Sequence, residues 1–354
     1  MSRYFSQKYA SLTPYTPGEQ PQERQYIKLN TNESPYPPSP LAQRLARQAA
    51  GDLQLYSDPE CRQLVAVAAE KLGLAPEEVL FTNGSDEILN FAFMAFCDAD
   101  HPAVFPNITY GFYPVFASLN GVPFEEIPLR DDLSVNVDDY CGIGRTVFLA
   151  NPNAPTGIAL SHADIERIVA SNPDNVVVVD EAYVDFGAES VLDLIRRYDN
   201  LLVCRTFSKS YSLAGARLGF GAACPALIAD LNTVKYSTNP YNVNRMTMAA
   251  GIGALTDGEY FAENCRKIAA TRADTVEKLE ARGFTVTPSS ANFVFARHGS
   301  VGGLALYRTL KENGVLIRHF ETPLLRDYNR ITIGSAEQME RFFAILDRVL
   351  EGLA

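Results

Sequence analysis

The chain has 354 residues, of which 47% are hydrophobic and 21% charged, so it is long enough to bury a large core in one or two structural units. Its formal net charge is −11, from 31 Lys and Arg against 42 Asp and Glu. An acidic chain without a basic cluster argues against nucleic acids and anionic membrane surfaces as partners. Any anion must then be bound locally, by a few arginines and backbone amides.

Cysteine and histidine spacing gives no sign of a disulfide framework or a metal site. The six cysteines are far apart, with no Cys-x-x-Cys pair, and the four histidines show no His-Glu-x-x-His spacing. No N-terminal signal pattern and no apolar run close to the length of a membrane span are present. We therefore expect reduced thiols, no bound metal and a cytoplasmic location.

The first 40 residues are rich in proline and turn formers, which excludes a long helix. We predict an extended arm with one short strand over 26–29. Its aromatic and apolar residues favour packing against the body of the protein or another subunit, although a loose terminus is the simpler alternative.

Residues 41–50 and 62–72 are predicted helices, followed by a strand at 79–81 and a helix at 86–96. The turn before that last helix contains Gly84 and Ser85. Free backbone N–H groups at a helix start can hold a phosphate. The alternative is an ordinary capped helix, in which Asp86 and Glu87 complement the helix dipole and would repel an adjacent phosphate.

The middle of the chain alternates apolar strands with helices, which predicts a parallel sheet covered on both faces. The predicted strands span residues 103–105, 146–150, 175–180 and 201–204, and the predicted helices span 111–119, 161–170 and 190–197. Ligands of such sheets bind at the carboxyl ends of the strands. Four polar residues fall just past strand ends, so one pocket can collect them: Tyr110, Asn153, Asp180 and Lys209.

The last hundred residues predict a smaller α+β unit. It begins with a long helix over 257–283 and continues with four strands and two further helices. The strands are predicted at 284–287, 292–295, 315–317 and 330–333, and the helices at 301–312 and 336–351.

The segment 205–217 combines an amine with hydroxyl groups and a guanidinium, directly after a buried strand. Around Lys209 it contains Thr206, Ser208, Ser210 and Arg217. This combination is typical of a small-anion site beside a reactive amine, although a polar surface loop would also contain these residues.

Asp180 ends a run of four valines, and Tyr183 follows it. A carboxylate at the mouth of so apolar a strand is costly unless it meets a cation. A simple Asx-turn is the alternative. Together with Lys209, an aromatic platform and a phosphate site, these residues form the set that a pyridoxal phosphate enzyme needs: an amine for the Schiff base and a carboxylate for the ring nitrogen.

Three motifs in this order and spacing resemble the fold-type I pyridoxal phosphate aminotransferases, and within them the histidinol-phosphate aminotransferases. The motifs are Asn151-Pro152-Asn153-Ala154-Pro155-Thr156-Gly157, Asp180-Glu181-Ala182-Tyr183 and Ser208-Lys209 with Arg217. Supporting stretches lie at 12–18, 29–35, 56–59, 83–87 and 330–334. The resemblance covers nearly the whole chain.

The resemblance implies an α/β fold, with a mainly parallel seven-stranded sheet in a large cofactor domain and a smaller α+β domain. The implied division is an N-terminal arm over 1–40, which belongs partly to the small domain and to a dimer contact, a large domain over 41–255 and a small domain over 256–354. Lys209 would form the Schiff base and shuttle the proton, Asp180 would pair with the pyridinium nitrogen, and Tyr183 would bond the phenolate oxygen. The implied ring platform is Tyr110, and the implied phosphate ligands are Gly84, Ser85, Thr206, Ser208, Arg217 and, from the neighbouring subunit of a homodimer, Tyr56.

One position departs from the family pattern. The family usually has Asn immediately before Pro-Thr-Gly, where it bonds the phenolate oxygen of the cofactor, but this chain has Ala154 there. Either Asn153 substitutes through a shifted loop or the bond is missing.

For the substrate, Arg330 and Arg318 lie in or beside predicted strands, and a guanidinium fork grips carboxylate or phosphate in two places at once. Surface arginines at a sheet edge are the alternative. Tyr15 and Tyr241 are candidate walls for an imidazole, although tyrosines also serve in simple packing.

The resemblance implies amino transfer from L-histidinol phosphate to 2-oxoglutarate, which yields imidazole acetol phosphate and L-glutamate in histidine biosynthesis. An aromatic amino-acid aminotransferase and a threonine-phosphate decarboxylase use the same cofactor residues and stay open as alternatives. A cofactor-binding transcription regulator would need a DNA-binding module, for which the arm leaves no room. A nicotinamide dehydrogenase is disfavoured because Gly219-Phe220-Gly221 lacks the third glycine.

Overall fold

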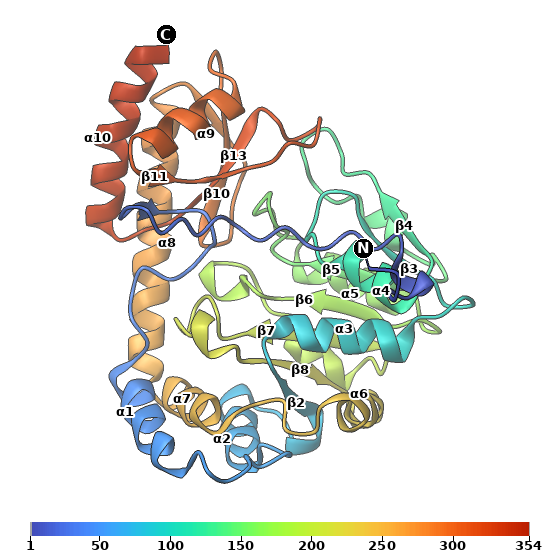
Figure 1. Ribbon diagram of the computed structural model, residues 1–354. Helices are drawn as coiled ribbons and strands as arrows, with labels where there is room; N and C mark the ends of the chain where they lie inside the picture. Colours follow the sequence, from blue (N-terminus) through green and yellow to red (C-terminus); the bar gives the residue numbers. More distant parts are fainter. Residues whose placement is uncertain (1, 354) are drawn as a thin grey trace.

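A central seven-stranded sheet organises the chain, whose residues 2–353 are described by a computed structural model (Figure 1). The strand order is β2-β8-β7-β6-β5-β3-β4, and β8 is the one strand of this sheet that runs in the opposite direction to the other six. The strands are β2 (Val79–Thr82), β3 (Ala103–Pro106), β4 (Phe124–Ile127), β5 (Thr146–Ala150), β6 (Val177–Asp180), β7 (Leu201–Thr206) and β8 (Gly219–Ala223).

Helices bury both faces of this sheet, which explains why its strands are apolar without alternation. Within β6, Val177 and Val179 belong to one core cluster and Val178 belongs to another. The helices of this part are α1 (Pro40–Ala49), α2 (Arg62–Leu72), α3 (Ser85–Phe96), α4 (Tyr113–Asn120), α5 (His162–Ser171), α6 (Pro225–Thr238) and α7 (Arg245–Thr256). Short 3-10 helices are η1 (Gln7–Tyr9), η2 (Ala50–Asp52), η3 (Pro76–Glu78), η4 (Val137–Tyr140), η5 (Val184–Phe186), η6 (Leu192–Arg196) and η7 (Ala214–Ala216).

A second, antiparallel sheet with the order β12-β13-β10-β9 lies beside the first and has its own core. It is built from β9 (Phe284–Val286), β10 (Phe293–His298), β12 (Arg318–His319) and β13 (Tyr328–Thr332), with the helices α8 (Gly258–Glu280), α9 (Gly303–Glu312) and α10 (Ala336–Leu353). The long helix α8 runs along the side of the molecule from the α7 end to this sheet (Figure 1). No helix within residues 2–353 is long and apolar enough to span a membrane.

The N-terminal segment crosses the molecule and joins the small sheet's core (Figure 1). Near its start, Tyr15 stacks on Phe112 with ring centroids 4.2 Å apart. Further on, β1 (Ile27–Lys28) pairs in parallel with β11 (Val315–Leu316). The segment therefore touches both halves of the chain before the first long helix begins.

The predicted fold class is confirmed, with a mainly parallel sheet and a smaller α+β part. The α-helix predicted at 190–197 is wrong, because this stretch forms only the 3-10 turns of η6. The carboxylate of Glu181 accepts hydrogen bonds from the hydroxyl of Ser190 and the N–H of Val191, at 2.7 Å each, and so fixes the start of this short connection.

Two strands of the large sheet, β4 and β8, were not predicted from the sequence, for opposite reasons. The edge strand β4 has three exposed residues, two of them glutamates, so it resembles a polar loop. The strand β8 contains Gly219 and Gly221 because helix α3 packs against it: a Cβ at Gly219 would lie 2.5 Å from the backbone nitrogen of Ser85. Glycine disfavours strands in general, and here it is required by close approach. Helices α6 and α7 and the two-residue β12 were also not predicted.

Candidate active site

A cavity of about 450 Å³ opens at the carboxyl ends of β5, β6 and β7, beside the start of α3. This is the end of a parallel sheet at which ligands bind. Its walls include eight of the residues that the sequence predicted for the cofactor: Ser85, Tyr110, Asp180, Tyr183, Thr206, Ser208, Lys209 and Arg217. The other lining residues are Gln20, Thr31, Glu33, Asp86, Ala150, Ala154, Ala182, Ala214 and Gly215.

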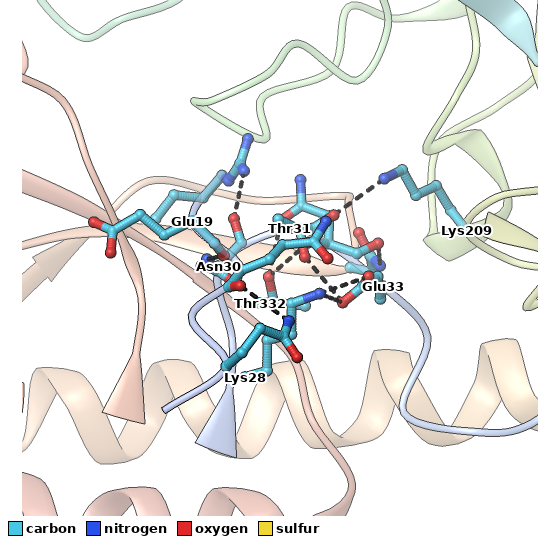
Figure 2. Close-up of polar contacts among 12 residues, drawn as sticks. Glu19, Lys28, Asn30, Thr31, Glu33, Lys209 and Thr332 are labelled. Carbon is cyan, nitrogen blue, oxygen red and sulfur yellow. Dashed lines mark hydrogen bonds and ion pairs between the residues drawn. The ribbon is translucent and has the colours of Figure 1, made fainter. Parts of the chain in front are cut away.

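Lys209 extends into this cavity from the loop that follows β7. Its Nζ donates a hydrogen bond to the carbonyl oxygen of Thr31 at 3.3 Å and lies 5.8 Å from the ring centre of Tyr183. Figure 2 shows the amine pointing at Thr31, which belongs to the N-terminal segment. The loop is held in shape by hydrogen bonds from the N–H of Phe207 to the carbonyl of Leu218 and from the N–H of Leu213 to the carbonyl of Phe207. The amine is therefore placed by the fold rather than left on the surface.

Asp180 ends β6 with only 4% of its surface exposed. Its carboxylate accepts a hydrogen bond from the Tyr113 hydroxyl at 3.3 Å and from the Ala182 N–H at 3.1 Å. Burial raises its pKa to about 7, and it forms no ion pair within residues 2–353. A buried carboxylate without a cation fits a ligand that brings one, such as the protonated ring nitrogen of pyridoxal phosphate.

The start of α3 and the 205–217 segment meet at one end of the cavity. Gly84 has a φ of +77°, and a Cβ there would lie 2.6 Å from Nη2 of Arg217, so this guanidinium fits only against glycine. Arg217 itself has a φ of 55°. On the other side, the hydroxyl of Thr206 donates to Ser208 at 3.0 Å. Free helix N–H groups, hydroxyls and a guanidinium make this a suitable cup for a phosphate.

The acids at the start of α3 both have hydrogen-bond partners, and Asp86 is ion-paired with Arg217. Asp86 accepts from Arg217 at 2.8 Å and from the hydroxyl of Tyr110 at 2.6 Å. Glu87 accepts from the Asn83 N–H at 2.7 Å and from the Asn242 amide at 2.6 Å. A phosphate entering the cup would share Arg217 with Asp86.

An aromatic wall stands beside the phosphate cup. The ring of Tyr110 lies 6.3 Å from that of Tyr15, and both contact Phe112. Burial, reinforced by the charge of Asp86, raises the pKa of Tyr110 well above its ordinary value. The phenol therefore stays neutral and keeps its proton for Asp86.

Asn153 does not reach the cavity. Its amide donates to the carbonyl of Ile108 at 2.9 Å and to Thr156 at 3.3 Å, and its oxygen accepts from the Thr109 hydroxyl at 2.8 Å. The next residue, Ala154, lines the cavity instead. Two of these bonds tie Asn153 to the loop after β3 and one to its own turn, so its predicted contact with the cofactor has no support in this geometry.

Two arginines lie opposite one another on adjacent strands, Arg318 on β12 and Arg330 on β13. Arg330 donates from Nη2 to the carbonyl of Asn30 at 3.0 Å, while its buried Nε has no partner within residues 2–353. Its guanidinium lies 5.3 Å from the ring centre of Phe293, and burial lowers its pKa. Arg318 donates to the carbonyls of Thr16 and Pro17 at 3.3 Å each. Neither forms an ion pair among the described residues, so the pair can receive an anion.

Tyr56 and Tyr241 lie away from the cavity. Their rings stack with centroids 4.7 Å apart, and they are 81% and 45% exposed. Within one chain, neither is brought to Lys209.

The sequence did not assign roles to several residues of the N-terminal segment that meet the site. Thr31 and Glu33 line the cavity, and the ion pair of Glu33 with Lys28 at 2.7 Å lowers the pKa of the carboxyl against its burial. The feature of the sequence that pointed to these contacts was the polar run Asn30-Thr31-Asn32-Glu33, directly after a short strand.

Comparisons with known proteins identify the family of the chain. Residues 24–346 match the family "Aminotransferase class I and II". A histidinol-phosphate aminotransferase of Brachyspira hyodysenteriae is 46% identical over 344 residues, which cover 97% of each chain, and one of Acinetobacter baylyi is 46% identical over 343 residues, which cover 96% of this chain and 95% of that one.

Among solved structures, histidinol-phosphate aminotransferase from Sinorhizobium meliloti in complex with pyridoxal-5'-phosphate superimposes with a TM-score of 0.89 and 26% identity, covering 100% of this chain and 99% of that one. The family is dependent on pyridoxal phosphate, for which the cavity offers an amine, an unpaired carboxylate and a phosphate cup. The chain belongs to the class I and II aminotransferases and is a pyridoxal phosphate-dependent enzyme.

Proposed function

We propose that the enzyme transfers the amino group of L-histidinol phosphate to 2-oxoglutarate, giving imidazole acetol phosphate and L-glutamate, as a step of histidine biosynthesis. The names of the two relatives at 46% identity support this substrate. The observation that carries the proposal is Arg330, a guanidinium with a buried, unpartnered Nε and no acidic neighbour within residues 2–353. Such a group is stabilised by an anionic substrate.

We propose that Lys209 binds pyridoxal phosphate covalently, which supplies an electron sink for the charge that develops on the substrate carbon. Its amine, once free, would be placed to move a proton at the substrate carbon. Asp180 would keep the ring nitrogen protonated, Tyr183 would donate to the phenolate oxygen, and Tyr110 would cover the ring face. Gly84, Ser85, Thr206, Ser208 and Arg217 hold the phosphate. Support comes from the cavity that collects eight of these side chains.

The two half-reactions place different anions against the same arginines. Histidinol phosphate has a phosphate and no carboxylate, whereas 2-oxoglutarate has two carboxylates. A guanidinium fork accepts either anion, and Arg318 lies opposite Arg330 on the neighbouring strand. We assign both arginines, with Tyr15 beside them, to the distal end of the substrate. Coulombic contact of Tyr15 with both guanidiniums partly offsets the rise in its pKa that burial causes.

We further propose a homodimer in which Tyr56 reaches the phosphate cup of the partner, with Tyr241 contributing beside it. Tyr56 is 81% exposed, and Leu53 and Leu55 beside it are 56% and 57% exposed, so the loop between η2 and α2 presents apolar surface. We divide the chain into an arm (1–40), a large domain (41–255) and a small domain (256–354). All six cysteines, which lie within the described residues, are free thiols, in keeping with a cytoplasmic location.

The substrate assignment is tested by adding single amino donors to the cofactor-loaded enzyme and following loss of its visible absorption band. L-Histidinol phosphate should convert the band at low concentration, while phenylalanine and threonine phosphate should leave it. Conversion by phenylalanine alone would point to an aromatic aminotransferase. Carbon dioxide release from threonine phosphate would point to a decarboxylase.

A further inference from the structure

A chain of hydrogen bonds runs from Thr332, the last residue of β13, through Asn32 to Tyr183 at the cavity. The Thr332 hydroxyl donates to Oδ1 of Asn32 at 3.0 Å, and Nδ2 of Asn32 donates to the phenol oxygen of Tyr183 at 2.9 Å. Thr332 lies beside the segment that carries Asn30, Thr31 and Glu33 (Figure 2). These contacts join residues 151 and 300 positions apart, so they form only in the folded chain.

The direction of this chain is fixed by the backbone. The N–H of Asn32 donates to the hydroxyl oxygen of Thr332 at 3.0 Å, and this hydroxyl donates its own proton to Oδ1 of Asn32. With Oδ1 occupied in this way, Nδ2 of Asn32 faces Tyr183. If the amide were reversed, the Thr332 proton would have no acceptor there.

Asn32 is held rigidly in this orientation. It is 1% exposed, and its carbonyl oxygen accepts from the Asn292 amide at 3.0 Å. Its φ of 54° lies in the left-handed region, which Asn tolerates better than most residues. A residue so constrained acts through its fixed amide rather than through mobility.

The hydrogen bond from Asn32 restricts the direction in which the hydroxyl proton of Tyr183 can point. Because the phenol oxygen accepts from Asn32, its own O–H must point elsewhere, and it has no acceptor within residues 2–353. Tyr183 is 9% exposed and lines the cavity. The free direction for its proton is therefore into the cavity.

We propose that Asn32 is a positioning residue that commits Tyr183 to donate its proton to the phenolate oxygen of pyridoxal phosphate. The inference rests on the proposed binding of the cofactor at Lys209. It has particular weight in this chain because the Asn153 amide is bonded to Ile108 in the loop after β3, and Ala154, which packs in the same core cluster as Tyr183, has no side-chain donor. Tyr183 is left as the donor on that side of the cavity.

A donated hydrogen bond stabilises the phenolate and so favours the unprotonated state of the cofactor's imine nitrogen. Loss of the donor should raise the pH midpoint at which the visible absorption of the bound cofactor changes. One hydrogen bond corresponds to a shift of about 0.5–1 pH unit. This midpoint is measured on the loaded enzyme without substrate, so it does not depend on turnover.

Two variants break the series of hydrogen bonds at its middle residue, Asn32, and at its far end, Thr332. Asn32→Asp keeps the shape and the left-handed backbone but replaces the donor by an acceptor, which draws the Tyr183 proton away from the cavity. Thr332→Val keeps the shape of the threonine but removes the hydroxyl, which frees the Asn32 amide to reverse. Thr332→Ser is the matched control because it keeps the hydroxyl. Each midpoint is compared with that of Tyr183→Phe.

We expect Tyr183→Phe to raise the midpoint by about one unit, Asn32→Asp and Thr332→Val by at least about half a unit, and Thr332→Ser to leave it unchanged. In a Tyr183→Phe background, Thr332→Val should add nothing, because it acts through Tyr183. A Thr332→Val shift that persists in that background, or wild-type midpoints in both Asn32→Asp and Thr332→Val, would overturn the inference and leave the proposed function intact. A wild-type midpoint in Tyr183→Phe would overturn the inference together with the proposed role of Tyr183 at the cofactor, while the amino-transfer function would still be tested separately by the substrate assay.

Discussion

The hydroxyl of Tyr113 donates to the buried carboxylate of Asp180 at 3.3 Å, and no cation within residues 2–353 joins them. The formal charges that act most on Asp180 are the carboxylates of Asp86 and Glu181, and they raise its pKa further. The protein thus keeps a carboxylate in an environment that disfavours its charge. The proposed cofactor resolves this by bringing a pyridinium nitrogen to it.

Replacing Asp180 by Asn should weaken binding of pyridoxal phosphate at least about 100-fold, because a buried ion pair would lose one partner. The measurement is titration of the cofactor-free protein with pyridoxal phosphate, followed by absorbance. Tyr113→Phe, which removes a neutral neighbour of the same carboxylate, should weaken binding less than tenfold. Equal losses in the two variants would contradict the ion pair.

Asp180 also makes the stability of the cofactor-free protein depend on pH. Its pKa is about 7 in the folded chain and near 4 in an unfolded one, so folding disfavours the ionised form. The favourable contribution of the neutral carboxyl is complete below pH ~4 and is lost as the pH rises through 7.

In urea unfolding without cofactor, Asp180→Asn should therefore exceed the wild type in stability by on the order of 4 kcal/mol at pH 8, with little difference near pH 4. A difference that does not change between these two pH values would show that the carboxyl does not titrate in this way.

Gly84→Ala should weaken cofactor binding by moving Arg217, since the added Cβ would lie 2.6 Å from its Nη2. Gly121→Ala is the matched control, because its φ of +71° is similar and a Cβ there meets nothing within 4 Å. Both changes should cost about 1–2 kcal/mol of stability from the left-handed backbone. Only Gly84→Ala should raise the dissociation constant of pyridoxal phosphate, and a comparable rise in Gly121→Ala would refute the steric explanation.

Arg330→Lys should lower kcat/KM for histidinol phosphate and for 2-oxoglutarate by about 10–100-fold, because lysine cannot form the two parallel bonds of a guanidinium. Steady-state kinetics with each substrate varied in turn measures the loss. Arg297→Lys on the neighbouring strand β10 is the control, since Arg297 is exposed and packs over Tyr328. Unchanged kinetics in Arg330→Lys would remove this residue from the substrate site.

The homodimer predicts complementation between subunits. A Lys209→Ala chain lacks the amine but offers an intact Tyr56, and a Tyr56→Ala chain has the reverse defect. Mixing them after dissociation should restore about a quarter of wild-type activity, because half the dimers are mixed and each contains one intact site. No recovery in mixtures that form mixed dimers would place Tyr56 outside the partner's site.

The elements that the sequence predicted best are those whose local pattern is enough to define them. Helix α2 at Arg62–Leu72 and strand β5 at Thr146–Ala150 were predicted with their observed bounds. The edge strand β4 and the glycine-containing β8 depend on neighbours that a local pattern does not reveal.

Local sequence patterns also revealed only part of the candidate site. Asp180, Tyr183 and Lys209 could be grouped because each follows a strand of one parallel sheet. Asn32 and Thr31 reach the site from the N-terminal segment, and contacts across about 150 residues or more leave no trace in local spacing. Asn153 was placed at the cofactor from a motif, whereas its amide bonds to Ile108, Thr109 and Thr156, two of which belong to a loop more than 40 residues away in the sequence.

The most direct test of the central claim is borohydride reduction of the enzyme loaded with pyridoxal phosphate, followed by proteolysis and mass spectrometry. Reduction fixes the cofactor to the amine that holds it. We predict one pyridoxyl group per chain, on Lys209, and its loss when reduction follows addition of excess L-histidinol phosphate. A pyridoxyl group on another lysine, or one on Lys209 that histidinol phosphate does not displace, would contradict the account.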